Sequence, residues 1–168
     1  AAIIKRLEPG AYTAIVRNAD DSDGIGLIEL YDLSASDPSE MGNLSVRAQV
    51  GTGDNVLIDG LILQGSDPKR VLFRALGPSV KANGVTVPGA LMDPTLEVHD
   101  ANGLTLLTND NWNDAPNKSE IEASGLAPGD QHESAILLTL GAGNYTSIVR
   151  GVNGTTGIAL SEAYKLTN

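Results

Sequence analysis

The chain carries, at its N-terminus, a copy of its own C-terminal end. Residues 1–33 align without a gap to residues 134–166, and fifteen of the 33 positions are identical. The two stretches lie 133 residues apart, which is the size of a domain and much longer than the repeat of a solenoid. The 168-residue chain therefore contains one complete unit, preceded by the last quarter of another.

Short strand-like segments fill the complete unit. Residues 44–50 alternate apolar and polar side chains, and residues 55–65 and 69–77 are apolar runs bounded by turn residues. Short strands at a spacing of about ten residues predict an all-β fold, an antiparallel jelly-roll-like β-sandwich over residues 44–168. The polar stretch 34–43, which contains a proline, is predicted to be a linker.

Turn residues predict the local connections. The sequence DANG at 100–103 is of the kind that joins two strands, here within residues 95–110. One short helix is expected near 117–124, with the following glycine as its stop. In the N-terminal copy, residues 11–18 and 24–33 are predicted to pair as a hairpin around ADDSD.

Charge and composition limit the function classes. The formal net charge of −10 opposes binding to nucleic acid or to anionic membranes, both of which need clustered Lys and Arg. No apolar run is long enough for a membrane span, so membrane insertion is not expected. The absence of cysteine removes disulfides and zinc–thiolate sites. The chain starts within a motif and shows no signal peptide, as expected of a mature or trimmed product.

The second half of the unit resembles a known family. The stretches DPTLEVHDANGLTLLTNDNW and ESAILLTLGAGNYTSIVRGVNGTTGIALSEAYKL resemble the bacterial pre-peptidase C-terminal (PPC) domain and related jelly-roll modules. The matching features are the DANG hairpin, the pair Asn109-Asp110, and a hairpin at 143–159. The fuller unit, with VGTGDNVLIDGLIL and KRVLFRALGPSV, resembles a repeat of large secreted proteins of environmental bacteria. The resemblance implies an extracellular or cell-surface module that is not itself catalytic.

The densest polar cluster is TNDNWND, and it predicts a calcium site. Oxygen ligands at alternating positions can converge on a hard cation. The candidate ligands come from this loop and from neighbouring loops: Asp110, Asn111, Asn113, Asp114, Asp93, Asp100 and Glu133. The loop lacks the glycine and the distal glutamate of an EF-hand. The alternative is a loop of Asx turns, in which Asn and Asp bond their own backbone.

Other conspicuous residues have simpler interpretations. Trp112, the only tryptophan, could stack on a sugar ring, but packing as a lid on the core is the preferred interpretation. Ser134 follows His132 without a G-x-S-x-G context, so no catalytic triad and no enzyme activity are expected. Arg17 and Arg150 occupy equivalent positions of the repeat and are expected to pair with the glutamates twelve residues further on.

The N-terminal copy is predicted to be an assembly element. A lone hairpin is marginally stable and exposes unpaired edges. Six side chains of the copy are therefore expected to be buried in an interface: Tyr12, Ile15, Val16, Ile25, Leu27 and Tyr31. The copy could pair with residues 44–77 of its own chain or add strands to a neighbouring molecule. A third alternative is that the chain is one slice of a longer tandem array.

Two functions follow from this organisation. The first is a structural subunit of an extracellular bacterial fibre or surface layer, a head-to-tail homopolymer joined by β-strand addition through residues 1–33. The alternative is a calcium-stabilised accessory module that attaches a secreted enzyme to polysaccharide or to a cell surface, with a role in adhesion. With one Trp, four Tyr and one Phe, the chain has little material for a sugar-binding platform.

Overall fold

A computed structural model describes residues 1–20, 22–33 and 41–166 of the chain. The chain divides into two compact units, unit 1 (Ala1–Met41) and unit 2 (Gly42–Asn168). Most of the predicted linker, 34–43, lies outside the described residues, and unit 2 begins two residues earlier than the predicted sandwich.

Unit 2 is nearly all β-structure, as the sequence predicts. Its described residues form these strands: β1 (Asn43–Val50), β2 (Leu57–Leu63), β3 (Lys69–Leu76), β4 (Lys81–Ala82), β5 (Val85–Thr86), β6 (Pro94–His99), β7 (Thr105–Asn109), β8 (Ser134–Leu140), β9 (Gly143–Gly151) and β10 (Gly157–Leu166). Three short helices accompany them: η1 (Trp112–Asp114), α1 (Lys118–Ala123) and η2 (Val152–Gly154). The short β4–β5 hairpin lies between β3 and β6.

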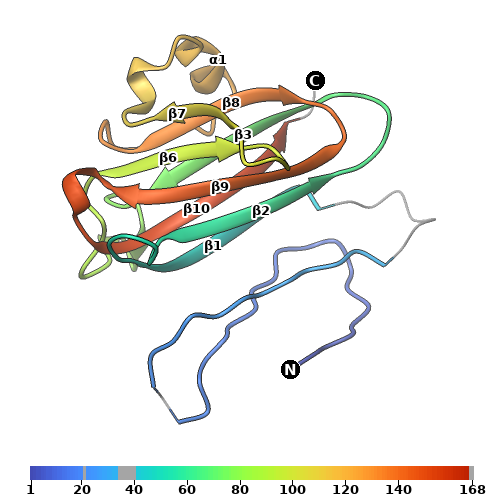
Figure 1. The fold of residues 1–168 in the computed structure, drawn as a ribbon, viewed down its shortest axis with the longest axis vertical. Helices are drawn as coiled ribbons and strands as arrows, with labels where there is room; N and C mark the ends of the chain where they lie inside the picture. The colour runs from blue at the N-terminus through green and yellow to red at the C-terminus, as the bar shows by residue number, and fades with distance from the viewer. Residues whose placement is uncertain (21, 34–40, 167–168) are drawn as a thin grey trace. The chain divides into compact units, whose positions relative to one another are not determined.

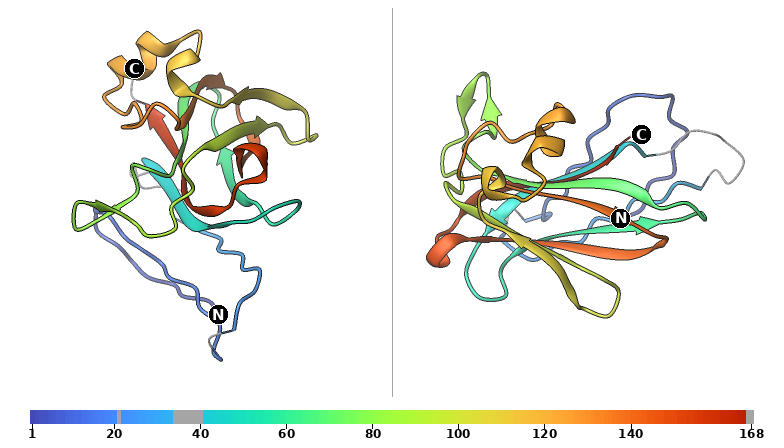
Figure 2. Two further views of the ribbon diagram at one scale, coloured as in Figure 1. Left: turned by 90° about the vertical axis from the view of Figure 1, so that its left-hand side faces the viewer. Right: turned by 90° about the horizontal axis from the view of Figure 1, so that it is seen from above.

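The eight longer strands form two antiparallel sheets that face each other (Figures 1 and 2). Sheet A has the order β1-β10-β3-β8, and sheet B has the order β2-β9-β6-β7. The pairs β1–β10, β2–β9, β3–β8 and β6–β7 are nested, first strand with last, as a jelly roll requires. The last three strands, β8 to β10, therefore return along strands that come earlier in the chain.

The core lies between the two sheets and follows the alternation of the strands. In β6, Pro94, Leu96 and Val98 are buried, while the side chains between them point outward. Facing strands contribute aliphatic side chains and Phe73, the only phenylalanine of the chain. A second apolar cluster, which includes Leu72 of β3, lies on the outer face of sheet A.

Helix α1 covers that outer cluster. Its single buried side chain, Ile121, packs against β3 and β8. The predicted helix near 117–124 is confirmed, and Gly125 ends it in the left-handed region at φ +71°. None of the helices in the described part of the chain is long and apolar enough to cross a membrane.

Unit 1 has a different character. None of its described residues lies in a strand, so the predicted hairpin of 11–18 and 24–33 is wrong. The chain reverses at 18–24, where the Asn18 side chain donates to Ser22, and two extended stretches run side by side without a ladder (Figures 1 and 2). Within unit 2, β1, β2 and β3 pair with β8, β9 and β10, and β1 and β2 stand at the edges of their sheets, so the composite sheet with residues 44–77 stays a prediction.

Candidate functional site

The repeated segment contains only one half of a sandwich. In unit 2, the return strands (β8, β9 and β10) make every ladder with the outgoing strands (β1, β2, β3 and β6) and none with one another. The expected hairpin at 143–159 is therefore wrong as well, because β9 and β10 belong to opposite sheets. The N-terminal copy (residues 1–33) corresponds to return strands alone. Such a segment has no intrinsic ladder partner, which accounts for the absence of strands in it.

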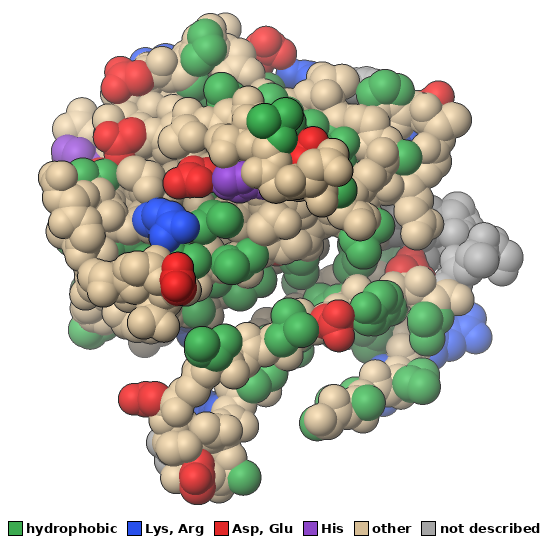
Figure 3. Space-filling view, in the orientation of Figure 1, with side chains coloured by type: hydrophobic (Ala, Val, Ile, Leu, Met, Phe, Trp, Pro, Cys, Tyr) green, Lys and Arg blue, Asp and Glu red, His purple; other side chains and the backbone are tan. Residues whose placement is uncertain are grey.

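The copy exposes the side chains that its counterpart packs. The six predicted interface residues have exposed fractions between 58% and 97% in the chain: Tyr12, Ile15, Val16, Ile25, Leu27 and Tyr31. Further apolar side chains of this segment lie uncovered beside them (Figure 3). Contiguous exposed apolar surface of this kind marks an interaction site in a soluble protein.

Alignment with unit 2 identifies which of these positions face a partner sheet. Among the counterparts of the six, Val149 is fully buried between the sheets and Tyr145 packs against the core. The others lie half-buried on outward faces: Ile148, Ile158, Leu160 and Tyr164. Sequence analysis missed four inward positions of the copy: Ile3, Leu7, Ile28 and Leu30. The signal was ambiguous, because residues 25–31 are apolar on both faces and periodicity alone does not choose between them.

One contact of the return strands is local, and the copy keeps it. Tyr145 donates from its hydroxyl to the carbonyl of Gly141, four residues upstream, at 3.1 Å. Tyr12 donates in the same way to the carbonyl of Glu8 at 2.6 Å. In both cases the ring lies over a glycine two residues earlier, Gly143 or Gly10, where a β-carbon would lie about 3.4–3.6 Å from it.

The other main polar contact of the return strands needs an outgoing strand. Glu162 of β10 accepts hydrogen bonds from Arg74 of β3, and both side chains are largely buried. Tyr164 donates to Glu162 at 2.9 Å, and its ring lies 4.9 Å from the Arg74 guanidinium. The predicted partner was Arg150, which instead lies 3.7 Å from Glu97 on sheet B. The prediction failed because adjacent strands of the sequence are in different sheets.

The copy keeps half of this network. Tyr31 donates to Glu29 at 3.1 Å, which reproduces the contact between the corresponding residues of β10. Both side chains are exposed in the chain, and the arginine that completes the network in unit 2 comes from β3. The copy therefore retains the two side chains whose counterparts in unit 2 contact Arg74.

A retained glycine leads to the same conclusion. At Gly157 a β-carbon would lie 2.6 Å from the backbone nitrogen of Leu91, which donates to Ile158 at 2.8 Å. At Gly24, the corresponding position, the nearest atom to such a β-carbon is the Asn18 side-chain nitrogen at 3.5 Å. Glycine is required at the first position by a close backbone contact that the second position does not make.

A buried polar cluster distinguishes the two segments. Asp59 of β2 lies opposite Ser147 of β9, and the Ser147 hydroxyl lies 3.1 Å from that of Ser161 on β10. Their exposed fractions are 4%, 1% and 0%. In the copy, Ala14 and Ile28 take the places of the two serines. We call Asp59, Ser147 and Ser161 the Asp59 cluster.

The carboxylate of this cluster is poorly solvated. Burial raises the pKa of Asp59 to about 7, and the Gly60 N–H and the Ser161 hydroxyl oppose that rise only in part. Neither carboxylate oxygen has a donor in hydrogen-bonding geometry. Sequence analysis missed this residue. Its signal was an acidic residue at an inward position of an alternating strand, between Leu57 and Leu61.

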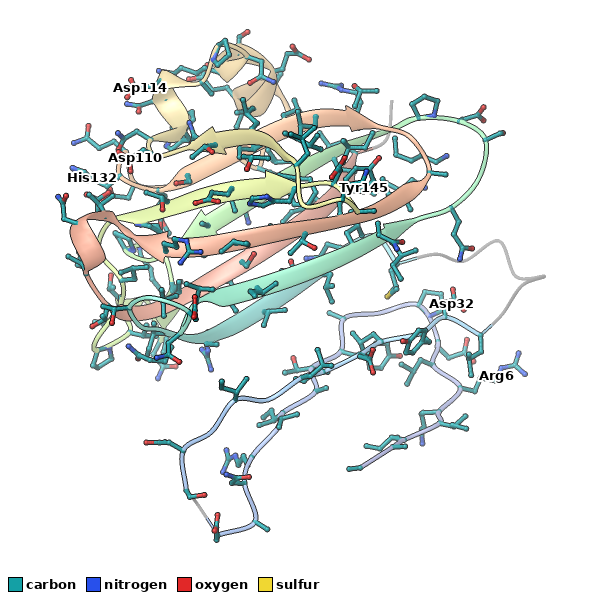
Figure 4. The ribbon with its side chains drawn as sticks, viewed as in Figure 1. Arg6, Asp32, Asp110, Asp114, His132 and Tyr145 are labelled. Atoms are coloured by element: carbon teal, nitrogen blue, oxygen red, sulfur yellow. The ribbon has the colours of Figure 1, made fainter. Side chains whose placement is uncertain are left out.

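Three of the predicted calcium ligands, Asp93, Asp110 and Asp114, are close enough for their charges to interact. Partial burial raises the pKa of Asp110, and the carboxylates of Asp93 and Asp114 raise it further. Asp110 and Asp114 lie at the same end of the sandwich (Figure 4). Buried oxygens of Asp93 and Asn113 have no hydrogen-bond partner, whereas Asn111 accepts a bond through its backbone from Asn109. In the described part of the chain, no group of three or more His, Cys, Asp or Glu is arranged to hold a metal ion.

The remaining predicted ligands have other roles. Asp100 lies at the opposite end of β6 from Asp93 and accepts from the backbone N–H groups of Asn102 and Leu104, which lowers its pKa. Glu133 is fully buried, and its carboxylate accepts from four donors: Gly77 N–H, Ser79 N–H, Ser79 hydroxyl and Asp130 N–H. These hydrogen bonds link the segment that follows β3 to the turn that precedes β8.

The residues weighed for sugar binding and catalysis are tied to the scaffold. Trp112 packs on the outer apolar cluster and donates from its ring nitrogen to the carbonyl of Asp130 at 3.0 Å, which confirms the predicted lid. The Ser134 hydroxyl lies 2.6 Å from the carbonyl of Pro94 and 2.7 Å from that of Asp110. His132 pairs with Asp130 at 2.9 Å and not with that hydroxyl.

Comparison of the chain with protein-family models gives no match, and comparison with curated proteins gives none either.

Proposed function

We propose that the chain is a structural module of an extracellular bacterial fibre or surface layer, in which modules join head to tail by β-strand addition. The N-terminal copy supplies the return strands of the module that precedes unit 2. The observation that carries the proposal is that residues 1–33 match return strands at fifteen of 33 positions, while the described residues of unit 1 contain no outgoing strand. The secreted location is supported by the family resemblance alone.

The energetic reason for such a junction is burial. The copy exposes apolar side chains along its whole length, and burying each aliphatic side chain contributes roughly 1.5–3 kcal/mol. Retention of Gly24, Glu29 and Tyr31 supports the same conclusion, because their counterparts act through contacts with residues outside the return strands.

The outgoing strands have two sources. A second copy of this chain would give the homopolymer expected from the sequence, provided that its own return strands leave their places. A preceding stretch of the same polypeptide would give a tandem array. In both cases residues 1–33 lie at the junction between modules.

A two-module chain tests this proposal. Residues 42–133 are repeated in front of residue 1, so that the copy follows a set of outgoing strands in the register of unit 2. The added Asp59 is replaced by Ala, so that Ala14 and Ile28 meet no buried carboxylate. Amide hydrogen exchange should show residues 1–33 protected in this chain and unprotected in the 168-residue chain. Exchange at the same fast rate in both chains would contradict the proposal.

The second candidate function is the calcium-stabilised accessory module. It is favoured by the convergence of Asp93, Asp110 and Asp114, where mutual repulsion and two unpartnered oxygens would be relieved by a cation. Calcium should then raise the melting temperature and a chelator should lower it, because a ligand of the folded state stabilises that state. Asp110→Asn should remove the response and Asp100→Asn should keep it. An unchanged melt of the parent chain in excess chelator excludes this candidate.

A further inference from the structure

The Asp59 cluster is divided between the two halves of the sandwich. Asp59 belongs to an outgoing strand, and Ser147 and Ser161 belong to two return strands in opposite sheets. All three are buried in a core that is otherwise aliphatic around them. A buried polar group in such surroundings is tolerated only when the facing groups suit it. Burial of Asp59 is therefore favourable only when the return strands that face it carry suitable polar side chains.

We propose that Asp59 makes unit 2 selective for its own return strands, and that the N-terminal copy closes a different module. That partner is an outgoing half of the same fold, with an apolar residue at the position of Asp59 and an arginine at the position of Arg74. The inference rests on the proposed function, in which residues 1–33 act as return strands.

Polarity is the first reason for selectivity. Seated on the outgoing strands of unit 2, the copy would place Ala14 opposite Asp59 and Ile28 at the position of Ser161. Both hydroxyls near the carboxylate would be lost. Asp59 already carries a raised pKa through burial in the presence of those hydroxyls. Without them, its burial is less favourable still.

Size is the second reason. Ile28 and Leu30 are larger than Ser161 and Ala163, whose places they would take. In the ladders of sheet A, Ala163 lies between Leu44 and Phe73, and it is 3% exposed. A leucine there would be overpacked. The module that accepts the copy must leave more room at these two inward positions.

Charge identifies the other feature of the partner. In unit 2, Arg74 donates to Glu162 and to the backbone carbonyl of Leu126, and Tyr164 completes the group. Glu29 and Tyr31 occupy the same two positions in the copy and already contact each other. An arginine at the corresponding point of the partner's third strand would complete this network.

The consequence is a fixed order of modules. Exchange between two identical copies of this chain would bring Ala14, Ile28 and Leu30 against Asp59 and Phe73, so the homopolymer is disfavoured. An array of non-identical modules avoids this mismatch, because each return half meets the outgoing half that suits it. Unit 2 is thus protected from strand exchange with the module in front of it.

The two-module chain tests the inference in three versions. The first keeps the added Asp59, the second carries Asp59→Ala in the added strands and L30A in the copy, and the third keeps Asp59 but carries A14S, I28S and L30A in the copy. The amides of residues 1–33 should be protected about a hundredfold more in the second and third versions than in the first. The second version removes the buried carboxylate, and the third supplies the hydroxyls that it faces in unit 2. If one of these versions fails to fold, the other still tests the inference.

The outcomes separate the inference from the function on which it rests. Equal protection with the added Asp59 and with Ala overturns the selectivity and leaves strand addition standing. Fast exchange of residues 1–33 in all three versions overturns strand addition and the inference together.

A disulfide experiment on the 168-residue chain tests exchange between identical copies. Ile62 lies opposite Asn144, whose counterpart in the copy is Ala11, and the chain has no cysteine of its own. Refolded at high concentration and oxidised, the control pair I62C/N144C should form its disulfide, since directly paired positions are within bonding reach. The pair A11C/I62C should not form an interchain disulfide. Its efficient formation with Asp59 present overturns the inference.

Discussion

Residues 1–33 and residues 134–166 have nearly half of their positions in common but differ in structure. The second stretch forms three strands in two sheets, and the first has no strand among its described residues. The local contact of a tyrosine with the backbone four residues upstream is present in both. What differs is the set of outgoing strands, which supplies every ladder of the second stretch. Residues 134–166 therefore owe their strand structure to pairing with the outgoing strands.

Matched substitutions in the two segments test whether only residues 134–166 are packed. The largest difference in the free energy of unfolding is expected between substitutions of Glu162 and of Glu29. Glu162→Ala should lower the free energy of unfolding of unit 2 by about 3–5 kcal/mol, because it leaves the buried Arg74 without its carboxylate. Glu29→Ala should leave the unfolding curve unchanged. Urea denaturation of both variants measures the difference. Equal effects would mean that residues 1–33 are packed in the chain.

The pH dependence of stability isolates Asp59, which the copy cannot accommodate. Its pKa is 3.8 when unfolded and about 7 when folded, so between these values the folded state holds a proton that the unfolded state has released. Stability should therefore fall as pH rises from about 4 to about 7, by up to about 4 kcal/mol, and stay low above that range. Asp59→Asn should abolish this slope. A parent chain with no loss of stability over that range, relative to the variant, would contradict the buried carboxylate.

The paired glycines give a smaller contrast. Gly157→Ala should cost about 1–3 kcal/mol, because the new β-carbon would overlap the backbone of Leu91. Gly24→Ala should cost nothing measurable in the 168-residue chain, where the new β-carbon would meet only the Asn18 side chain, at an ordinary contact distance of 3.5 Å. Thermal melts of the two variants suffice. A destabilising Gly24→Ala would show that its backbone contact already exists.

The smallest effect is expected from removal of the copy. A chain of residues 42–168 should melt within about 0.5 kcal/mol of the parent, because unit 2 contains its own return strands. Electron microscopy should show no filaments of either chain, because the copy does not suit the outgoing strands of unit 2. Filaments of normal appearance from the truncated chain would place the junction elsewhere.

The sequence predicts the eight longer strands of unit 2 well, because they are short apolar or alternating runs bounded by turn residues. The DANG hairpin between β6 and β7 and the helix that ends at Gly125 follow from the same local chemistry. Pairing is a different matter. Only a few residues separate β9 from β10, a spacing that favours a hairpin, yet η2 carries the chain to the other sheet with Asn153 and Gly154 at positive φ.

At the candidate calcium site too, the sequence predicts local neighbours better than contacts between distant parts of the chain. The carboxylates of Asp93 and Asp114 both raise the pKa of Asp110, and the calcium site built on them stays a prediction. The sequence-based prediction misplaced Asp100, because strand β6 lies between Asp93 and Asp100 and holds these two residues at opposite ends. Glu133 was a candidate ligand, but its carboxylate is occupied by four protein donors that come from distant parts of the chain.

Strand addition at the junction requires residues 1–33 to be without partner strands in the chain by itself. Amide hydrogen exchange, measured by residue on the monomeric 168-residue chain, compares this segment with residues 134–166 in a single sample. The amides of β8, β9 and β10 should be protected to the level of global unfolding, and those of residues 1–33 should exchange at the rates of an unstructured peptide. Strong protection of residues 1–33 in the monomer would show that they already have partner strands within the chain, and it would contradict the account.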